Sequence, residues 1–416
     1  MEDKLYLGVS REDITPLVGG KLYGYNDTTF SESVHDNLTA TAFVLQSGDV
    51  RVVLISATVC LIKTELSDRI RTEIAMRLTV PVENCILCAT HTHSGPNTAA
   101  EPGWGETDEE YCENIFVPRI IKAACDAARK MVYVKIGIAR GKSFVGINRR
   151  QLLTDNTVIL GQNEWGPFDP YMTILSFQDE GKNAIANIVH YGAHGTAAGL
   201  GTEITRDWPG VMTDRLEALT GGVTAFFNGP EGDVGPRLMN GGTMGDIRCV
   251  EELGSVAAMD AMRIYKKIRI WQDAKIICHG GILAVPLKRR MNLEAVRESL
   301  AEFEGGFIDI NGAGARKKHL ERVLASYEKG YTEKSHYEIP QTIIRIGEVA
   351  LAGFPYELFS EIGMRINSAS KIPHTLSLAN ANGSEGYFVT EDQICRGGYE
   401  VDMYNAVGVQ PYAQNA

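Results

Sequence analysis

Apolar, strand-like runs that each end in a short polar loop recur along this chain, and they limit its fold more than any other feature. Five such polar segments occur, and most are rich in glycine or proline. The runs alternate with amphipathic helical patterns, and loops at strand ends are where α/β folds place functional residues. The pattern therefore predicts an α/β protein whose chemistry lies where its strands end.

The predicted elements follow from hydrophobic periodicity and from start and stop signals. Strands are expected over 5–9, 40–46, 52–57, 84–90, 132–139, 172–177, 184–190, 223–228 and 343–354. Helices are expected over 63–78, 108–131, 208–219, 250–267 and 358–368. We expect one large domain over residues 1–416, with mixed β-sheets packed together and flanked by helices, and with 291–328 as a helical insert.

Composition limits the partners and the location of the protein. A net charge of −11 and a pI near 5.4 argue against a nucleic-acid partner, which needs a concentrated basic patch. The acidic N-terminus is unlike a signal peptide, and no apolar run approaches the length of a membrane span. The eight cysteines are scattered, as reduced core thiols are. We expect a cytoplasmic protein with a small-molecule substrate and no stable membrane insertion, and homo-oligomer formation stays open.

The first polar segment places two histidines together. His91 and His93 follow the predicted strand 84–90 and precede a Ser-Gly-Pro turn. Residues two apart on a strand share a face, so both imidazoles would leave on one side. A single histidine in an apolar strand is usually a core residue. Two of the nine histidines at one strand end favour a metal site, because neutral imidazole is a preferred zinc ligand.

The second segment contains His190 and His194 after the strand 184–190. Their i, i+4 spacing is typical of two metal ligands on a helix, but Gly192 and Gly195 disfavour a helix here. We therefore expect one ligand, His194, with His190 packed nearby.

The remaining three segments carry less specific signals. Residues 228–236 could present backbone N–H groups to an oxyanion or form a tight surface turn. Glu357 lies at a strand-to-helix junction, where a glutamate is more often a helix-dipole partner than a ligand. The last segment, 380–399, carries Tyr387 and Tyr399 among glycines.

Taken together and in order, these segments resemble the neutral/alkaline (non-lysosomal) ceramidase family, over about residues 7–401. The resemblance rests on a colinear set of motifs: Gly-Val-Ser-Arg11-Glu-Asp13, His91-Thr-His93-Ser-Gly-Pro, Ile-Asn148-Arg149, His194-Gly-Thr, Gly232-Asp233-Val, Pro355-Tyr-Glu357, and Gly386-Tyr387 through Tyr399-Glu400.

The resemblance implies a single zinc ion and a water molecule that attacks an amide carbonyl. Matched position by position, the implied zinc ligands are His91, His194, Glu357 and Tyr387. A catalytic zinc needs few protein ligands and an open position.

The same matching assigns residues around the metal. His93 is similar to a histidine behind the family's ligands, Arg149 to its transition-state partner and Tyr399 to the tyrosine beside the scissile group. Asp207 is expected to orient a histidine. Because His93, Asp207 and Asp233 are spare candidate ligands, a second metal ion stays open.

Two departures from the family bear on the substrate. Gly235 stands where ceramide-cleaving members carry a serine, so this position supplies no hydroxyl. The family's C-terminal immunoglobulin-like domain and a secretion signal are not expected here, which favours a soluble substrate over lipid at a membrane.

Three functions remain from the sequence. The first is a zinc-dependent hydrolase that cleaves an amide (C–N) bond of a small or acyl-bearing molecule. The second is an esterase or lactonase that uses the same site. The third is a non-catalytic metal-binding protein, suggested by Gly235.

Overall fold

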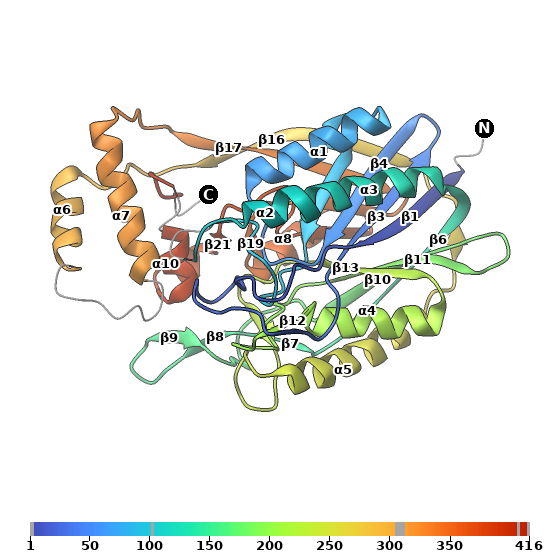
Figure 1. Ribbon diagram of the computed structural model, residues 1–416, viewed down its shortest axis with the longest axis horizontal. Coiled ribbons are helices and arrows are strands. Elements are labelled where there is room, and N and C mark those ends of the chain that lie inside the picture. Colours follow the sequence, from blue (N-terminus) through green and yellow to red (C-terminus); the bar gives the residue numbers. More distant parts are fainter. Residues whose placement is uncertain (1–3, 101–103, 304–312, 406–407, 414–416) are drawn as a thin grey trace.

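The computed structural model describes residues 4–100, 104–303, 313–405 and 408–413 (Figure 1). Its largest sheet has nine strands in the order β13-β11-β10-β6-β1-β3-β4-β5, with β15 paired to β6. These strands are β1 (Leu5–Asp13), β3 (Thr39–Ser47), β4 (Val50–Ala57), β5 (Cys85–Ala89), β6 (Val132–Lys142), β10 (Tyr171–Gln178), β11 (Ala184–Tyr191), β13 (Val223–Asn228) and β15 (Trp271–Gln272).

A second sheet of four strands has the order β16-β17-β18-β20. It consists of β16 (Ile276–Pro286), β17 (His336–Ile346), β18 (Val349–Gly353) and β20 (His374–Leu378). Four further strand pairs are β2 (Ser33–Val34) with β12 (Glu203–Ile204), β7 (Gly146–Asn148) with β14 (Val234–Pro236), β8 (Arg150–Leu152) with β9 (Val158–Leu160), and β19 (Glu357–Leu358) with β21 (Tyr387–Phe388).

The helices flank these sheets. They are α1 (Thr64–Leu78), α2 (Glu109–Tyr111), α3 (Val117–Arg129), α4 (Asp207–Thr220), α5 (Ile247–Tyr265), α6 (Leu293–Ala301), α7 (Ala313–Glu328), α8 (Ser360–Ala369), α9 (Glu391–Ile394) and α10 (Tyr399–Asn405). In Figure 1, α1 and α3 lie along one half of the large sheet and α4 and α5 along the other.

The helices, the large sheet and the second sheet form three layers, and strand alternation explains this arrangement. In β3, Val44 belongs to the core beneath α1 and α3, whereas Phe43 and Leu45 belong to the core shared with the second sheet. In β10, Ile174 packs towards α4 and α5 and Leu175 towards the second sheet. Because successive side chains point to opposite faces, one face of the large sheet packs against the helices and the other packs against the second sheet. The predicted fold class, mixed sheets packed together with flanking helices, is confirmed.

The structure corrects several predicted elements. The helix expected over 108–131 is interrupted by a π-helical turn at Cys112–Phe116. The helix expected from 250 begins at Ile247, because the Asp246 side chain caps the backbone N–H groups of Arg248 and Cys249.

All four strands of the second sheet differ from the prediction, and neither β16 nor β20 was predicted. The strand expected over 343–354 is an antiparallel hairpin of β17 and β18, which turns at Gly347 with φ +58°. Strand β16 was not predicted, because Gly280 and Gly281 interrupt its apolar pattern.

The predicted insert contains α6 and α7, which share a small core of Val296, Leu320 and Val323. Part of it, 304–312, lies outside the described residues. That the chain forms one domain stays a prediction.

The edge strand β13 approaches β4 and β5 at the other end of the large sheet. The Ser56 hydroxyl on β4 donates a hydrogen bond to the Phe226 carbonyl on β13 at 2.6 Å. At the ends of the strands, the Asn228 side-chain amide donates to the Thr90 carbonyl, just after β5, at 3.3 Å. Since β4 and β5 are parallel, as are β11 and β13, the loops that follow β5, β11 and β13 gather at one place.

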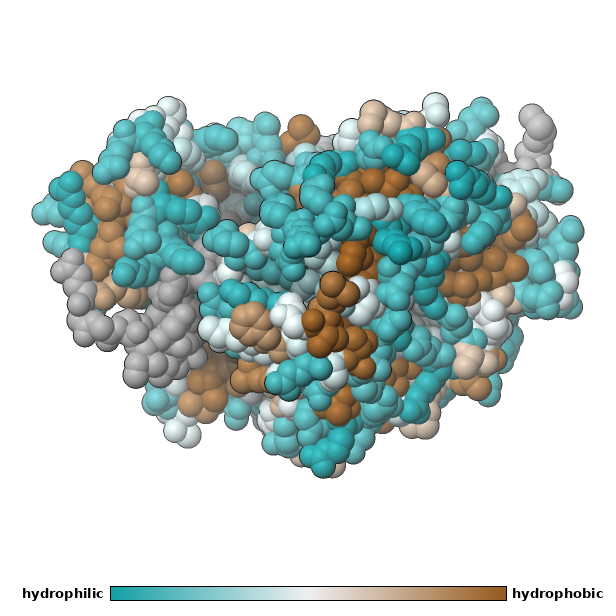
Figure 2. All heavy atoms as spheres, in the orientation of Figure 1, coloured by the Kyte–Doolittle hydropathy of each residue, from teal (hydrophilic) through white to brown (hydrophobic). Residues whose placement is uncertain are grey.

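In the described part of the chain, no helix is both long enough and apolar enough to cross a membrane. The face shown in Figure 2 is largely hydrophilic, with apolar residues in separate patches.

Candidate metal centre

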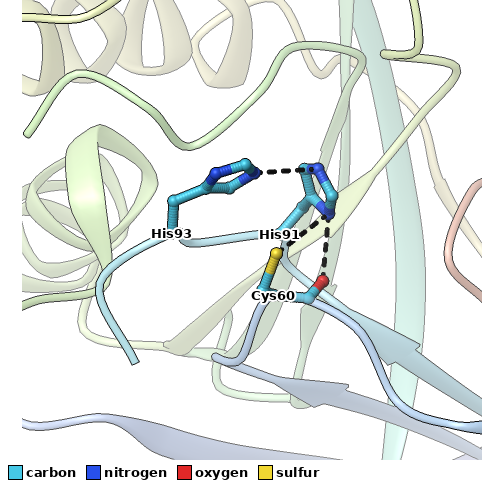
Figure 3. A group of neighbouring side chains, drawn as sticks. All are labelled: Cys60, His91 and His93. Carbon is cyan, nitrogen blue, oxygen red and sulfur yellow. Dashed lines mark hydrogen bonds between the residues drawn. The ribbon is translucent and has the colours of Figure 1, made fainter. Parts of the chain in front are cut away.

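His91 lies just beyond β5 in a backbone conformation that an extended strand does not have. Its φ is +68°, and β5 ends two residues earlier at Ala89. The His91 Nδ1 atom lies 3.0 Å from the Cys60 carbonyl oxygen and 3.7 Å from the Cys60 Sγ (Figure 3). A hydrogen bond from Nδ1–H to the carbonyl leaves the Nε2 lone pair free for a metal ion.

The two histidines of the first segment do meet, but not for the reason that strand alternation suggested. The Nε2 atoms of His93 and His91 lie 3.2 Å apart (Figure 3). The left-handed backbone at His91 turns the chain, and the His93 N–H then donates to the Gly195 carbonyl at 3.1 Å. Gly195 has no room for a side chain, because a Cβ there would lie 2.8 Å from the His91 carbonyl oxygen. The loops after β5 and β11 therefore pack backbone to backbone.

His194 follows β11 and is fully buried. Its Nδ1 atom lies 3.0 Å from the Glu231 carbonyl oxygen and 3.1 Å from that of Val234. The Trp208 indole N–H donates to the His194 carbonyl at 2.9 Å. Burial, foremost, and the nearby Arg149 lower the pKa of His194 to about 3, so its imidazole is neutral.

Glu357 connects the two histidines. Its Oε2 atom lies 3.1 Å from the His194 Nε2 and 3.3 Å from the His91 Nε2. Burial alone would raise the pKa of Glu357, but the adjacent His91 and His194 hold it well below its ordinary value. The carboxylate is therefore ionised between two imidazoles.

Tyr387 reaches the cluster through strand pairing. The parallel β19–β21 ladder places Tyr387 opposite Glu357, and the two side chains share a hydrogen bond. The Tyr387 hydroxyl also accepts a hydrogen bond from Arg149 Nη2 at 3.0 Å. Burial, more than the neighbouring Glu357, raises the pKa of Tyr387 well above its ordinary value.

The donor set fits a zinc ion. Ligand atoms of His91, His194 and Glu357 lie within 4.8 Å of one another, and all three residues are buried. Backbone carbonyls hold both imidazoles by Nδ1, which directs Nε2 to the shared carboxylate. Histidine nitrogen and carboxylate oxygen are donors that zinc takes in proteins. The assignment of the four ligands stays a prediction.

A buried arginine faces the cluster. The Arg149 Nε donates to Glu400 Oε1 at 2.9 Å, while Nη2 points to Tyr387. Glu400 is also bonded to Arg150 Nη1 at 2.6 Å. Two guanidinium groups thus share one buried carboxylate, which leaves a positive charge beside the candidate ligands.

Tyr399 and His93 contact different members of this cluster, Tyr387 and His91 respectively. The rings of Tyr399 and Tyr387 lie 5.8 Å apart in an edge-to-face arrangement. Burial, and the neighbouring His91 and His194, lower the pKa of His93 well below its ordinary value. The ring of His93 also contacts that of Tyr25, with centroids 4.8 Å apart.

Asp207 does not have the predicted role of orienting a histidine. Its carboxylate accepts hydrogen bonds from the backbone N–H groups of Ala197, Ala198 and Trp208. It holds the loop that follows His194, whereas the histidine rings are oriented by backbone carbonyls. Burial raises the pKa of Asp207 to about 6.

Asp233 likewise bonds to groups other than the metal cluster. It accepts hydrogen bonds from the Ser360 backbone at 2.6 Å and from the Asn148 side chain at 3.2 Å. Its own carbonyl accepts from the Arg149 N–H at 2.8 Å. Asp233 therefore fixes the segment that carries Arg149 against the start of α8, and burial raises its pKa to about 6.

The neighbouring Thr243 explains why residue 235 is a glycine. Gly235 pairs with Ile147 in the β14–β7 ladder. A Cβ on Gly235 would lie 2.6 Å from Thr243 Cγ2 and 2.8 Å from Thr243 Cβ. The Thr243 side chain therefore occupies the space that a serine at 235 would need.

His190, the histidine of the second segment that is not a predicted ligand, has a hydrogen-bond partner outside the cluster. His190 Nε2 bonds to the Ser377 carbonyl at 2.9 Å, as expected of a packed core histidine. Conversely, two residues at the site had no predicted role. Glu400 was visible only as the neighbour of Tyr399, and no sequence pattern distinguishes Tyr25 from an ordinary loop tyrosine.

The fold and this cluster define an α/β protein with a buried candidate metal centre of histidine, glutamate and tyrosine beside an arginine. The chain belongs to the neutral/alkaline non-lysosomal ceramidase family, because residues 5–256 match that family's N-terminal domain. The family is metal-dependent, and membership supports a hydrolase that acts on an amide bond.

Two solved structures share the fold. The chain is similar to neutral ceramidase from Pseudomonas aeruginosa, with 20% identity, a TM-score of 0.76, and coverage of 97% of this chain and 71% of that one. It is also similar to a ceramidase complexed with C2, with 18% identity, a TM-score of 0.75, and coverage of 99% and 73%. A search of curated proteins found no match.

Proposed function

We propose that this chain is a zinc-dependent hydrolase in which a water molecule attacks the amide carbonyl of a small or acyl-bearing soluble substrate. The observation that supports it most is the convergence of His91, His194 and Glu357 within 4.8 Å, beside the buried Arg149. When bound, zinc would lower the pKa of a coordinated water to about 7.

The chain's own residues would hold the metal ion and stabilise charge. His91 and His194 would bind it through Nε2, Glu357 through its carboxylate and Tyr387 through its hydroxyl. Arg149 would stabilise the negative charge that develops on the carbonyl oxygen, a task for which a permanently charged guanidinium is suited. Glu400 would keep Arg149 oriented, since it accepts from Nε and leaves Nη2 directed to the centre.

A proton must reach the leaving amine. His93 is neutral because burial lowers its pKa, so one ring nitrogen can donate while the other accepts. Its Nδ1 atom is buried and without a hydrogen-bond partner in the described structure. Tyr399 is the second candidate donor, since its ring lies against that of Tyr387. His93 would accept a proton from the attacking water at one ring nitrogen and then release a proton to the amine, whereas Tyr399 would donate its hydroxyl proton and regain one from that water.

The alternative reaction at the same site is ester or lactone hydrolysis. An alkoxide leaves with less help from a proton than an amine does, so the donor distinguishes the two substrates. Tyr399→Phe should impair amide cleavage much more than ester cleavage if the amide is the substrate for which this site is built.

The test is turnover of matched N-acyl amides and O-acyl esters by zinc-loaded protein. Loss of turnover after chelation, recovery with zinc, and loss in Glu357→Ala would support the proposal, with His190→Ala as the active control. The esterase would be favoured if Tyr399→Phe lost ester turnover and amide turnover equally and the wild type cleaved the ester faster than the matched amide. A folded protein with one zinc ion that cleaves neither would indicate the second alternative, a non-catalytic metal-binding protein.

A further inference from the structure

The long loop between β1 and β3 contacts the segment that carries His91 and His93. Within it, the Leu22 N–H donates to the Thr29 carbonyl and the Ser31 N–H to the Gly20 carbonyl, each at 2.9 Å. The Tyr23 N–H donates to the Gly95 carbonyl at 2.9 Å, which ties the loop to the segment that carries His91 and His93. The loop is therefore anchored directly at the site.

Gly24 brings this loop into contact with His93. Its φ is +133°, and a Cβ there would lie 2.5 Å from the His93 Cγ. Only glycine allows so close an approach in that conformation. As a consequence the next residue, Tyr25, places its ring 4.8 Å from the His93 ring, with the planes inclined by 55°.

The hydroxyl of Tyr25 is buried and has no hydrogen-bond partner in the described structure. A buried hydroxyl usually has a partner, because leaving it unpaired costs free energy. The Tyr25 ring contacts that of His93, whose Nε2 atom lies 3.2 Å from the Nε2 atom of the candidate ligand His91. The unpartnered hydroxyl therefore belongs to a side chain that packs directly beside the candidate metal centre.

We infer that Tyr25 is a substrate-binding residue whose hydroxyl donates a hydrogen bond to an oxygen atom of the substrate close to the scissile amide. This rests on the proposed function and narrows it. The preferred substrate is an amide with an additional hydroxyl, carbonyl or carboxylate oxygen near the C–N bond. The bound substrate supplies the hydrogen-bond partner that the Tyr25 hydroxyl otherwise lacks, so this hydrogen bond forms only in the complex.

The test compares Tyr25→Phe with the wild type and with Tyr171→Phe, a control on β10 at the protein surface. The zinc content should not change, and the Tm should be equal or higher, because the variant removes an unpaired buried hydroxyl. Affinity for acetohydroxamate, measured by calorimetry on zinc-loaded protein, should fall by about fivefold to tenfold. Turnover of N-acetylethanolamine should lose kcat/KM mainly through KM, whereas N-ethylacetamide, which lacks the extra oxygen, should lose little.

Three results would overturn the inference: unchanged hydroxamate affinity, equal losses on both amides, or a lower Tm with lost zinc, which would show a structural role. The probe separates this inference from the proposed function. If the wild type cleaves no amide but Tyr25→Phe still weakens hydroxamate binding, Tyr25 binds ligand and the proposed reaction is wrong. If the wild type cleaves amides, and Tyr25→Phe has the same hydroxamate affinity and the same kcat/KM on both amides, the proposed reaction is supported but Tyr25 has no role in it.

Discussion

Glu400 accepts a hydrogen bond from Arg149 across 251 residues of sequence, with Oε1 and Nε 2.9 Å apart. The side chains are 1% and 6% exposed, and the second carboxylate oxygen binds Arg150. The helix α10 therefore determines where the Arg149 guanidinium lies, although it supplies no predicted metal ligand. The position of the charge at the centre depends on this long-range pair.

Removal of the Glu400 charge should destabilise the protein. Glu400→Gln leaves two buried guanidinium groups without their carboxylate, so the free energy of unfolding should fall by about 3 kcal/mol in urea denaturation. Amide turnover should fall as well. The control is Glu361→Gln, which loses only an exposed i, i+4 pair with Arg365 and should change stability by less than about 0.5 kcal/mol. Equal effects of the two variants would contradict the role of Glu400.

Metal retention should separate the three buried histidines. His91→Ala and His194→Ala should each purify without zinc, because each removes an Nε2 directed at Glu357. His190→Ala should keep about one zinc ion per chain, since its ring bonds to the Ser377 carbonyl. Elemental analysis of protein purified without chelator measures this. Zinc retained in the first two variants would mean that the ligands are misassigned.

Restoring the family serine should fail on its own. Gly235→Ser places a Cβ within 2.6 to 2.8 Å of Thr243, and overpacking of this kind costs about 1–3 kcal/mol. Thr243→Gly removes both clashing atoms, so the double variant should recover stability relative to Gly235→Ser. Thermal unfolding of the two single variants and the double variant measures the coupling. Strictly additive losses would show that Thr243 does not occupy that space.

Acid should remove the stabilisation that Asp36 provides. Burial alone would raise its pKa, but Arg206, with Nε 2.7 Å from Oδ1, and Thr205 hold it below the ordinary value of 3.8. Since the pKa is lower when folded, the contribution is present above pH 3.8 and is lost as the pH falls through the folded value.

Asp36→Asn should therefore be less stable than the wild type by about 2 kcal/mol at pH 7. Urea denaturation over a series of pH values should show the difference shrinking below the ordinary aspartate value. A difference that is the same at pH 7 and at strongly acid pH would show that ionisation of Asp36 does not stabilise the fold.

The sequence by itself determined the alternation of strands and helices and the positions of the polar segments. Apolar periodicity is a local property, so strands such as β3, β10 and β11 were predicted close to their observed bounds. It also determined the family and its candidate ligands, because those residues stand in ordered motifs. Strand β16, where glycines interrupt the apolar pattern, and strand β20, a run of only five residues, were not predicted.

Only the tertiary structure decided which of these residues meet, and how. His91 and His93 come together through a left-handed turn, where strand alternation no longer applies. Glu400 is hydrogen-bonded to Arg149, and the ring of Tyr25 contacts that of His93, because segments far apart in the chain pack together. Such contacts depend on loop closure and on space left by glycines like Gly24, and neither leaves a periodic signal in the sequence.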